Sequence, residues 1–402
     1  MSADSNLTQT FAPRLLHGAD QPKAAAAPQV PLSAPDITQA EIDAVTAVLC
    51  TPHLSLGPEL AAFEAALVAY HSVSHAVCVN SGTAGLHLAL LTLNIGEGDE
   101  VIVPSFAFVA VANTVLQAGA TPVFVEIDPF TLNLDPAAVE RAVTPRTRAI
   151  LVVHTFGVPA EMDALLGIAR HHRLALIEDA CEAIGAQFDG RRAGSFGDLA
   201  ILGFYPNKQI TTGEGGAVLA RDPGHAARLR SLRNHGRNGS RLGSGDWLDN
   251  AEPGYNYRLS EMACALGRVQ LGRIEEMLAL RQAAAGRYDA LLGGVPGLDL
   301  PPLTLPNRII SWFVYVVRLP EKVDRDQVQA ALARRGIATG RYFAPIHLQP
   351  AWRAHWSASA ATLPITEAIA ERTLALPFFN RISIRQQEEA AIALGEAINS
   401  QQ

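Results

Sequence analysis

Cysteine is scarce in this chain, and the few cysteines are scattered. Cys50, Cys78, Cys181 and Cys264 are separated by long stretches and show no metal-ligand spacing. We therefore expect reduced thiols that mostly fill the core, and no metal site.

Clusters of basic residues are also missing. The formal net charge is −7, and no run of lysine and arginine of the kind that follows a phosphate backbone is present. These two features argue against nucleic acid as the main partner.

Long apolar runs are missing as well. No stretch reaches the roughly 18 uninterrupted apolar residues that a membrane helix needs. The first 30 residues contain no apolar signal core, and residues 23–28 read Lys-Ala-Ala-Ala-Ala-Pro. We expect a flexible leader at residues 1–30, no membrane segment and a cytoplasmic location.

The chain is long and apolar enough for a sizeable core. Its 402 residues, 49% of them hydrophobic, exceed one average domain. Residues 293–307 are rich in proline and leucine and look like a domain linker. We predict a large α/β domain at residues 31–292 and a smaller α+β domain at residues 293–402.

Apolar strands alternate with helices through the first half of the chain. The expected strands are residues 75–79, 100–104, 121–127, 148–154, 174–179, 199–204 and 217–220, and the expected helices among them are residues 86–93, 107–118 and 162–172. Continuous apolar strands in such an alternation are typical of a mostly parallel sheet covered by helices on both faces. The predicted fold class is therefore α/β.

Further elements flank this region. A helix should begin at Asp36 or Thr38, and the others are expected at residues 59–71, 224–234 and 260–292, the last capped by Ser260 or Asn256. Residues 237–250 are polar and glycine-rich and should form a loop. In the smaller domain we expect strands at residues 312–319 and 336–343, a helix at 325–335 and a final helix from 384.

The chemistry centres on Lys208, which lies on a tight connection between two buried strands. Desolvation there would lower the pKa of a lysine, and a neutral amine can attack a carbonyl carbon. Upstream, Asp179 ends another apolar strand. A carboxylate that pairs with a pyridinium, about thirty residues before such a lysine, is the arrangement expected for pyridoxal phosphate (PLP).

A second signal lies where the strand at 75–79 meets a helix. Ser81, Gly82 and Thr83 stand at this junction, where free backbone N–H groups and the helix dipole attract a phosphate. The alternative is an ordinary helix cap.

Several other polar or aromatic residues follow expected strand ends, which is where ligands bind in parallel sheets. Phe108 could stack on a cofactor ring, although the pattern alone favours the core. His154 and Thr155 share this ambiguity.

Six motifs together resemble one known family. They are Ser81-Gly-Thr-Ala84, Pro104-Ser-Phe-Ala-Phe108, Glu178-Asp-Ala180, Phe204-Tyr-Pro-Asn-Lys208, Thr212-Gly-Glu-Gly-Gly216 and Gly254-Tyr-Asn-Tyr-Arg258. From about Val30 to the C-terminus, the chain resembles the DegT/StrS-type sugar aminotransferases, which are PLP enzymes of fold type I.

The resemblance implies roles for individual residues. Lys208 would carry the cofactor and shuttle protons, and Asp179 would pair with the pyridine nitrogen. The remaining cofactor contacts that it implies are the phosphate cradle of Gly82, Thr83 and Ala84, the stacking residue Phe108, and Asn256 with Arg258 from a neighbouring subunit.

Two departures from the family pattern affect these roles. Glu182 stands where many relatives carry Gln or His near the ring hydroxyl, and Gly203 stands where many have a phosphate-binding serine. A carboxylate at 182 would be either protonated or repelled by a phenolate. The missing serine would leave the phosphate to Thr83, to backbone groups and to the partner chain.

The resemblance implies an aminotransferase for a nucleotide-linked keto-deoxy sugar, with glutamate as amino donor and a homodimer with shared sites. The alternatives are a PLP-dependent sugar dehydratase, a cyclitol aminotransferase, or a regulatory protein that keeps the fold without turnover. By position alone, the candidate substrate contacts are Tyr205, Arg237, Tyr342 and His347.

Overall fold

The computed structural model describes residues 29–237, 248–353 and 362–401. Nearly all of the expected leader and most of the loop expected at residues 237–250 lie outside these ranges. Val30, at the end of the expected leader, is buried and forms a parallel bridge with Ile337.

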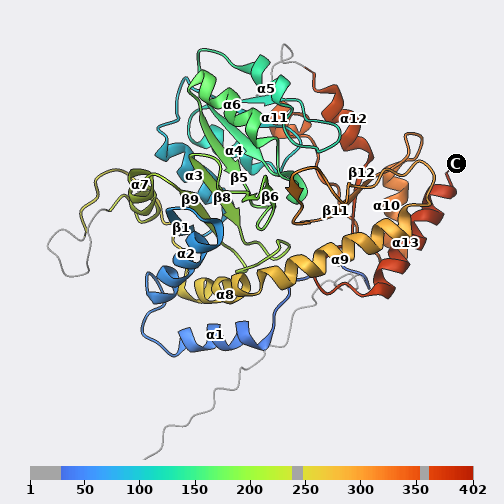
Figure 1. The fold of residues 1–402 in the computed structure, drawn as a ribbon, viewed down its shortest axis with the longest axis horizontal. Helices are drawn as coiled ribbons and strands as arrows, with labels where there is room; N and C mark the ends of the chain where they lie inside the picture. Colours follow the sequence, from blue (N-terminus) through green and yellow to red (C-terminus); the bar gives the residue numbers. More distant parts are fainter. Residues whose placement is uncertain (1–28, 238–247, 354–361, 402) are drawn as a thin grey trace, which may run out of the picture.

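A seven-stranded sheet forms the centre of the molecule (Figure 1). Its order is β1-β9-β8-β5-β4-β2-β3. The strands are β1 (His75–Val79), β2 (Glu100–Pro104), β3 (Thr121–Val125), β4 (Thr147–Val153), β5 (Ala175–Asp179), β8 (Leu199–Gly203) and β9 (Gly216–Ala220). β9 alone runs in the direction opposite to the other six strands of this sheet. The predicted mostly parallel α/β sheet is confirmed.

Helices cover both faces of the sheet because its side chains alternate in direction. Val101 and Val103 of β2 belong to the core under one layer of helices, whereas Ile102 belongs to the core under the other. The first layer contains α3 (Gly82–Thr92), α4 (Ala110–Gln117) and α7 (Pro223–Arg233). The second contains α2 (Pro58–His71), α5 (Pro136–Ala142), α6 (Met162–His172) and α8 (Glu261–Gly272).

The helix expected at residues 260–292 is two helices, so that prediction is wrong. α8 ends at Gly272, and α9 (Ile274–Leu292) begins after Arg273, whose φ and ψ of −106° and 7° are not helical. The Arg273 guanidinium bonds Glu41 of α1 (Gln39–Leu49) at 2.7 Å, which anchors the break. Ser260 caps α8 by accepting the N–H of Ala263, so Asn256 does not cap this helix.

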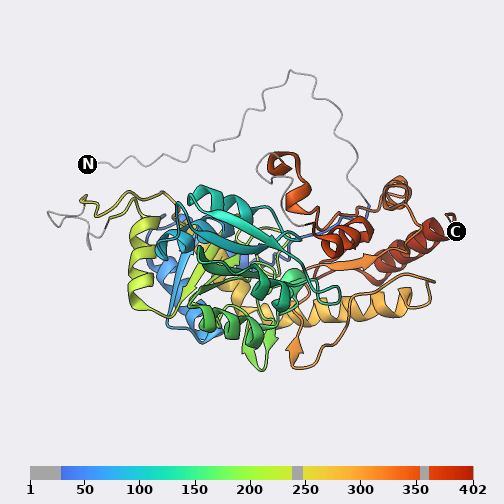
Figure 2. The ribbon, with the colours of Figure 1, turned by 90° about the horizontal axis from the view of Figure 1, so that it is seen from above.

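α9 runs from the sheet to the C-terminal part of the chain (Figures 1 and 2). Its last turns share a core with α10 (Arg325–Arg334), α13 (Ile384–Asn399) and the strand pair β11 (Tyr315–Arg318) and β12 (Thr373–Leu376). The division of the chain at residues 292 and 293 stays a prediction.

The strand expected at residues 336–343 does not form. Only isolated bridges occur there, at Ile337 and Gly340. Gly340 exchanges backbone hydrogen bonds with Ala375 of β12, but no continuous ladder follows. The segment is therefore a connection whose far end, at Tyr342 and Phe343, reaches the cavity described below.

Short elements complete the fold. They are α11 (Pro350–Arg353), α12 (Pro364–Arg372), the 3₁₀ turns η1 (Thr155–Gly157) and η2 (Ile346–Leu348), and the small sheet of β6 (Gln187–Phe188), β7 (Arg191–Arg192) and β10 (Arg308–Ile309).

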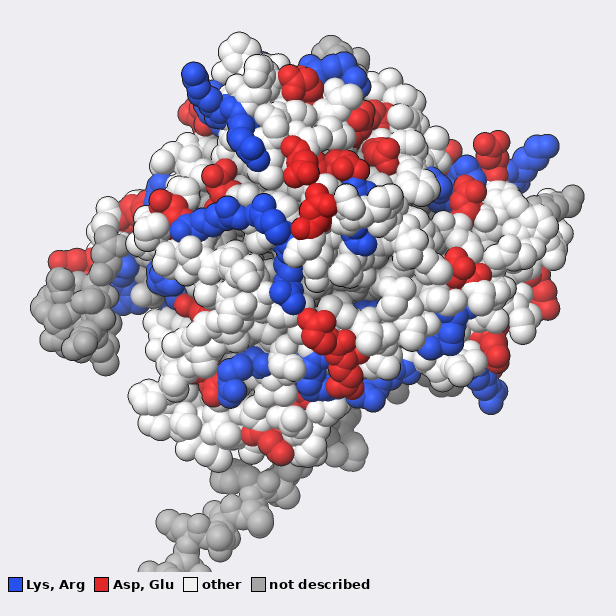
Figure 3. Space-filling model, in the orientation of Figure 1, with Lys and Arg blue, Asp and Glu red and all other residues white. Residues whose placement is uncertain are grey.

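The described residues contain no helix long and apolar enough to cross a bilayer, and no cluster of side chains suited to a metal ion. Acidic and basic side chains are intermixed over the face shown in Figure 3.

Candidate active site

A cavity of about 550 Å³ opens at the carboxyl ends of the parallel strands. Asp179 is the last residue of β5 and Gly203 the last of β8, while Ser81 lies two residues after the end of β1. The cavity brings together these predicted residues: Ser81, Gly82, Thr83, Phe108, Asp179, Glu182, Tyr205, Lys208 and Tyr342. Its volume is typical of sites for small molecules and cofactors.

Lys208 points its amine into this cavity from a turn after β8. Its backbone N–H donates to the carbonyl of Tyr205 at 2.9 Å, which closes the turn. The amine lies 3.4 Å from Glu182 Oε1 and 3.8 Å above the centre of the Phe313 ring. The amine is thus held between a carboxyl group and an aromatic face.

Glu182 is buried next to the lysine. Its second oxygen, Oε2, accepts the N–H of Phe156 at 3.0 Å. Burial raises the pKa of Glu182, and the charge of Lys208 opposes that rise without cancelling it. The side chain therefore favours its protonated form more than a free glutamate does.

Asp179 lies on the floor of the cavity with one oxygen engaged. Oδ1 accepts the N–H of Cys181 at 3.0 Å, and the Cys181 thiol also interacts with this carboxylate. An aspartate that is held by its own turn and lines a cavity can pair with a cationic group of a ligand.

The start of α3 offers backbone donors on the same side. Ser81 caps the helix through its hydroxyl, which accepts the N–H of Ala84 at 3.0 Å. Ala84 does not line the cavity and its N–H is taken, so it should be removed from the expected cradle. Gly82 and Thr83 remain, and their N–H groups have no acceptor inside the helix.

Cys181 explains why Gly82 and Gly203 carry no side chain. A Cβ atom at Gly82 would lie 2.8 Å from the Cys181 sulfur, and one at Gly203 would lie 3.0 Å from it. The thiol fills the space between the start of α3 and the end of β8. Burial raises the pKa of Cys181 well above its usual value, so the thiol stays neutral.

Phe108 is not a core residue. It is 62% exposed and lies on the cavity wall just before α4. Phe106, two residues earlier, is fully buried instead. Phe108 is therefore free to stack on a planar ligand.

His154 and Thr155 do not line the cavity. The Nδ1 atom of His154 accepts the N–H of Ala160, so its Nε2–H donates to Glu178 at 3.0 Å. Glu178 also accepts the N–H groups of Gly194, Phe196 and Gly197. This buried pair fixes the loop after β7, which is a structural role.

The structure places three other predicted contacts away from the cavity. His347 is buried and bonds Ser105 Oγ at 2.6 Å and Glu367 Oε1 at 3.3 Å. Arg237 and Arg258 both donate to Asn234 Oδ1, each at 2.9 Å. None of the three lines the cavity of its own chain.

Asn256 also lies outside this cavity, on the segment that runs beside the start of α3. The backbone N–H of Asn80 donates to the carbonyl of Tyr257 at 2.9 Å, and the Asn80 side chain reaches the carbonyl of Asn256 at 3.5 Å. Asn256 is exposed.

Phe313, Asn207 and Phe343 line the cavity but were not expected from the sequence. Phe313 follows the linker and belongs to no motif, so only the fold could place it under Lys208. Asn207 stands inside the lysine motif, and its position beside Lys208 was the available signal.

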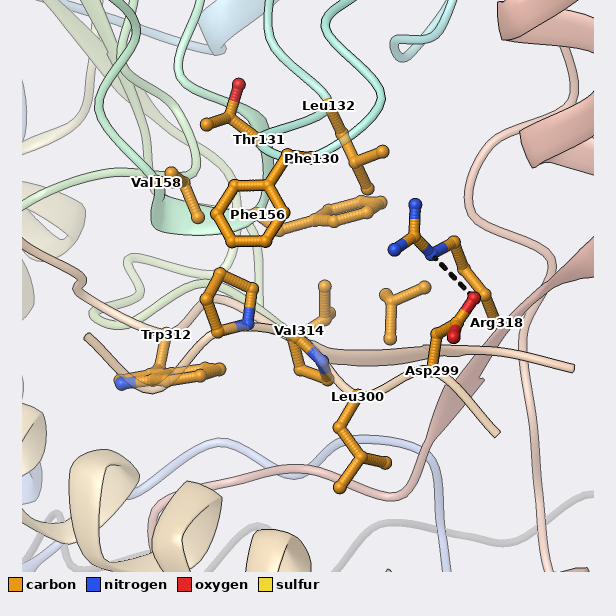
Figure 4. A pocket seen from close by; sticks show the side chains of 13 residues that line it. Phe130, Thr131, Leu132, Phe156, Val158, Asp299, Leu300, Trp312, Val314 and Arg318 are labelled. Atoms are coloured by element: carbon orange, nitrogen blue, oxygen red, sulfur yellow. Dashed lines mark ion pairs between the residues drawn. The ribbon is translucent and has the colours of Figure 1, made fainter. Parts of the chain in front are cut away.

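A second cavity, of about 50 Å³, lies on the other side of the same segment (Figure 4). Trp312 and Phe156 border it, and the ion pair between Asp299 and Arg318 closes one end at 3.6 Å. Adjacent residues 312 and 313 thus face different cavities. The second is too small for a sugar or a cofactor.

Comparison with known proteins places the chain among sugar-modifying enzymes. The sequence profile of the DegT/DnrJ/EryC1/StrS aminotransferase family matches residues 35–394. GDP-perosamine synthase of Caulobacter vibrioides is 41% identical over 354 residues, which cover 87% of this chain and 93% of that protein. The dTDP-3-amino-3,4,6-trideoxy-alpha-D-glucose transaminase of Streptomyces venezuelae is 43% identical over 342 residues, covering 84% and 87%.

Solved structures agree. DesV of S. venezuelae superposes with a TM-score of 0.84 at 41% identity, covering 92% of this chain and 98% of that one. A candidate sugar aminotransferase of Streptococcus pneumoniae, solved in its PLP form, gives a TM-score of 0.87 at 27% identity, covering 93% and 99%. The predicted family and fold are confirmed.

Proposed function

The chain belongs to the DegT/DnrJ/EryC1/StrS aminotransferase family, and from this premise we propose that it aminates a keto-deoxy sugar linked to a nucleotide, with L-glutamate as amino donor. The two named relatives, which act on GDP- and dTDP-linked sugars by name, support the substrate class. The observation that carries the proposal is the convergence of the Lys208 amine, the Asp179 carboxylate and the open N–H groups of α3 on one cavity.

These residues fit pyridoxal phosphate. The N–H groups of Gly82 and Thr83 suit its phosphate, the Asp179 carboxylate suits its ring nitrogen, and Phe108 offers an aromatic face. When bound, the cofactor supplies an electron sink for the carbon that loses or gains a proton.

The protein's own part is proton transfer and positioning. Lys208 would hold and move the proton at its Nζ atom. Its amine is the only nitrogen base among the described side chains that line the cavity. Glu182, 3.4 Å away, would keep that amine oriented. Asp179 would hold a positive charge on the ring nitrogen.

The same cavity is short of positive charge for anionic ligands. Asp179, Glu182 and Glu214 line it together with one cation, Lys208. A phosphate and a nucleoside diphosphate both need cations or hydrogen-bond donors. We therefore propose that Asn256 and Arg258 of a second copy complete each site.

The outer face of α1 supports a homodimer. Its inner side buries Glu41, only 1% exposed, which pairs with Arg273. Its outer side leaves Ile42 and Leu49 51% and 60% exposed. Exposed apolar side chains on a helix suit a surface that a second copy covers.

The apolar surface continues towards the proposed shared residues. Leu54 and Leu56 are exposed, and the carbonyl of Leu54 accepts the N–H of Glu261. Ser55 pairs with Ser260, two residues beyond Arg258. One contact surface could therefore bury α1 and deliver Asn256 and Arg258.

The test is an assay of the purified protein with PLP, glutamate and a panel of GDP- and dTDP-linked keto sugars. We expect 2-oxoglutarate and an aminated nucleotide sugar, detected by mass, and neither product from Lys208→Ala. The chain has three lysines, Lys23, Lys208 and Lys322. Borohydride reduction followed by peptide mapping should therefore place the cofactor on Lys208 without ambiguity.

Three results would favour the alternatives. A dehydrated product without nitrogen would indicate a sugar dehydratase. A bound cofactor whose absorbance does not change when glutamate is added would indicate a regulatory protein. Amination of a cyclitol but of no nucleotide sugar would indicate a cyclitol aminotransferase.

A further inference from the structure

Arg281 is a buried cation directly beneath the lysine-bearing turn. It lies on α9 and is 2% exposed. Its Nη1 atom donates to the carbonyls of Trp312 and Phe313 at 3.1 and 2.9 Å, and Nη2 donates to the carbonyl of Lys208 at 3.3 Å. One side chain therefore joins three carbonyls from two distant segments.

No carboxylate pairs with this guanidinium among the residues that the structure describes. Its Nε atom is buried without a hydrogen-bond partner. Burial lowers the pKa of Arg281 to about 10, and the charge of Asp36 opposes this shift. Besides the three carbonyls, only the Phe378 ring, whose centre is 5.7 Å from the guanidinium carbon, is recorded as a partner of this side chain among the described residues. A buried charge without a carboxylate partner is costly, so its position calls for a compensating role.

The three carbonyls belong to the two segments that hold the lysine amine. One is the carbonyl of Lys208 itself. Another belongs to Phe313, whose ring lies 3.8 Å from Nζ. The third belongs to Trp312, whose backbone φ of 52° is a conformation that non-glycine residues seldom adopt without support.

The other side of the amine is tied to the same segment. Gln209 donates through Nε2 to the carbonyl of Glu182 at 2.6 Å and to Ser311 Oγ at 3.1 Å. The backbone N–H groups of Ser311 and Phe313 donate to the carbonyls of Gly157 and Phe156. Residues 311–313 thus support both the ring below Lys208 and the carboxyl beside it.

We propose that Arg281 is a positioning residue for amine transfer, which locks the Lys208 turn and the Phe313 segment into one unit and so sets the approach of the amine to the reacting carbon. This inference rests on the proposed function. Arg281 touches no ligand, since it does not line the cavity and acts only through Lys208 and Phe313.

The first test compares Arg281→Gln and Arg281→Lys with the native enzyme. We expect kcat to fall about tenfold in Arg281→Gln and KM to stay within about twofold, because the transfer geometry changes but the cavity wall does not. Arg281→Lys keeps a charge and a donor, and should recover part of the loss.

A matched control is available on the same helix. Arg287 lies six residues further along α9 and bonds Gln387 of α13, away from the lysine turn. Arg287→Gln should keep kcat. If it lowers kcat as much as Arg281→Gln does, the effect belongs to α9 in general and the proposal is wrong.

The second test needs no turnover. Each protein, freed of cofactor, reacts with pyridoxal phosphate over a range of pH, is reduced with borohydride and is mapped at Lys208. We expect slower modification in Arg281→Gln and a midpoint displaced by about half a pH unit or more. Lys322 in the same digest reports the reactivity of a lysine outside the site.

A double-mutant cycle that combines Arg281→Gln with Phe313→Leu tests whether Arg281 acts through the Phe313 ring. If Arg281 acts through the Phe313 ring, the loss in the double variant should be smaller than the sum of the single losses. Additive losses would contradict that route.

The outcomes are decisive for the proposal. Unchanged kcat and an unchanged modification profile, with only a lower Tm, would make Arg281 merely structural. Should Arg281→Gln not fold, Arg281→Lys decides alone, and native kcat with a native profile overturns the proposal. If the native enzyme transfers no amine, the proposed function fails, whereas the Lys208 modification profiles still test Arg281.

Discussion

At the level of single residues, the site depends on how its charged groups share a small volume. Lys208 stands between Glu182 and Phe313, and Asp179 and the exposed Glu214 line the same cavity. Were all three carboxyls ionised, the cavity would be anionic and would repel a phosphate. The raised pKa of Glu182 reduces this problem, because burial favours its neutral form.

Asp179 should matter through its charge. Asp179→Asn keeps the shape but removes the proposed partner of the ring nitrogen, which would lower the pKa of that nitrogen and weaken the electron sink. We expect a loss in rate of at least about a hundredfold, on the order of 3 kcal/mol. Steady-state kinetics of the amine transfer measure it.

Asp198 is a suitable control, because its side chain bonds the end of β5 opposite to Asp179. Asp198 accepts the N–H of Leu176 near the start of β5, so Asp198→Asn should leave the rate near that of the native enzyme. A near-native rate for Asp179→Asn would assign the pyridine nitrogen to another group.

The titration of Glu182 should change how the stability of the protein depends on pH. Its pKa is higher in the folded chain than in the unfolded one. Such a carboxyl contributes stability below its unfolded pKa, and that contribution disappears as pH rises through the folded value. Glutamine does not titrate, so the Tm of the native chain should fall relative to that of Glu182→Gln as the pH rises above about 4, the ordinary pKa of a glutamate.

The measurement is the difference in Tm between the two proteins, both without cofactor, at several pH values. Glu97→Gln replaces an exposed carboxyl and should show a flat difference. A flat difference for Glu182→Gln as well would show that Glu182 does not titrate as its burial predicts.

The sequence predicted several residues that meet in the cavity, because motifs carry them. Lys208, Asp179 and the start of α3 stand at strand ends, and the alternating pattern placed those ends on one edge of the sheet. Phe313 could not be predicted, since its role arises from a chain crossing far from any motif. Arg281 did leave a signal, because it interrupts the buried stripe of Met277, Ala284 and Tyr288 on α9.

At the level of elements, remote carboxylates replace local caps. The residue before α2 is Gly57, which has no side chain to cap the helix. Glu261 of α8, 1% exposed, supplies the cap instead by accepting the N–H groups of Gly57, Glu59 and Leu60 at 2.9, 2.8 and 3.1 Å. This contact fixes α2 against the helix that follows the 254–258 segment.

Removing this cap should destabilise the fold. Glu261→Ala leaves buried N–H groups without acceptors, and we expect the free energy of unfolding to fall by about 2–4 kcal/mol. Glu261→Gln keeps an acceptor oxygen and should lose less. Urea denaturation of the three proteins measures the difference.

Glu388→Ala is the control, because Glu388 is exposed on α13 and should change stability by no more than about 0.5 kcal/mol. Equal losses in Glu261→Ala and Glu388→Ala would refute the remote cap.

The elements that the sequence misjudged share a physical cause. The apolar pattern runs unbroken across Arg273, so it could not show that a salt bridge to Glu41 ends the helix there. At residues 336–343 the sequence predicted a strand, but the backbone forms only two isolated bridges there, to Val30 and Ala375. In both cases tertiary contacts, which no local pattern contains, decide the backbone.

At the level of the whole molecule, two features of a single chain call for a partner: the charge of the cavity and the exposed apolar residues of α1. Lys208 is the single cation among the described residues that line the cavity, and α1 exposes Ile42 and Leu49. Gly203 deepens the first deficit, because the thiol of Cys181 leaves no room for a side chain that could donate a hydroxyl. A symmetric dimer would satisfy both needs at once.

The shared-site hypothesis makes a quantitative prediction for mixed subunits. Chains with Lys208→Ala and chains with changes at both Asn256 and Arg258 should each be inactive. After subunit exchange, every heterodimer would contain one site with Lys208 from one chain and Asn256 and Arg258 from the other. Random exchange of equal amounts should thus restore about a quarter of the native activity.

The decisive control mixes two defects on the same side of the site. Lys208 and Asp179 line one cavity of one chain, so heterodimers of Lys208→Ala and Asp179→Asn contain no site with both residues intact. That mixture should stay near the residual activity of Asp179→Asn, while the first mixture recovers. If the first mixture also stays inactive although heterodimers are seen by native mass spectrometry, Asn256 and Arg258 do not act across the interface, and the phosphate must be held by Gly82, Thr83 and their own chain alone.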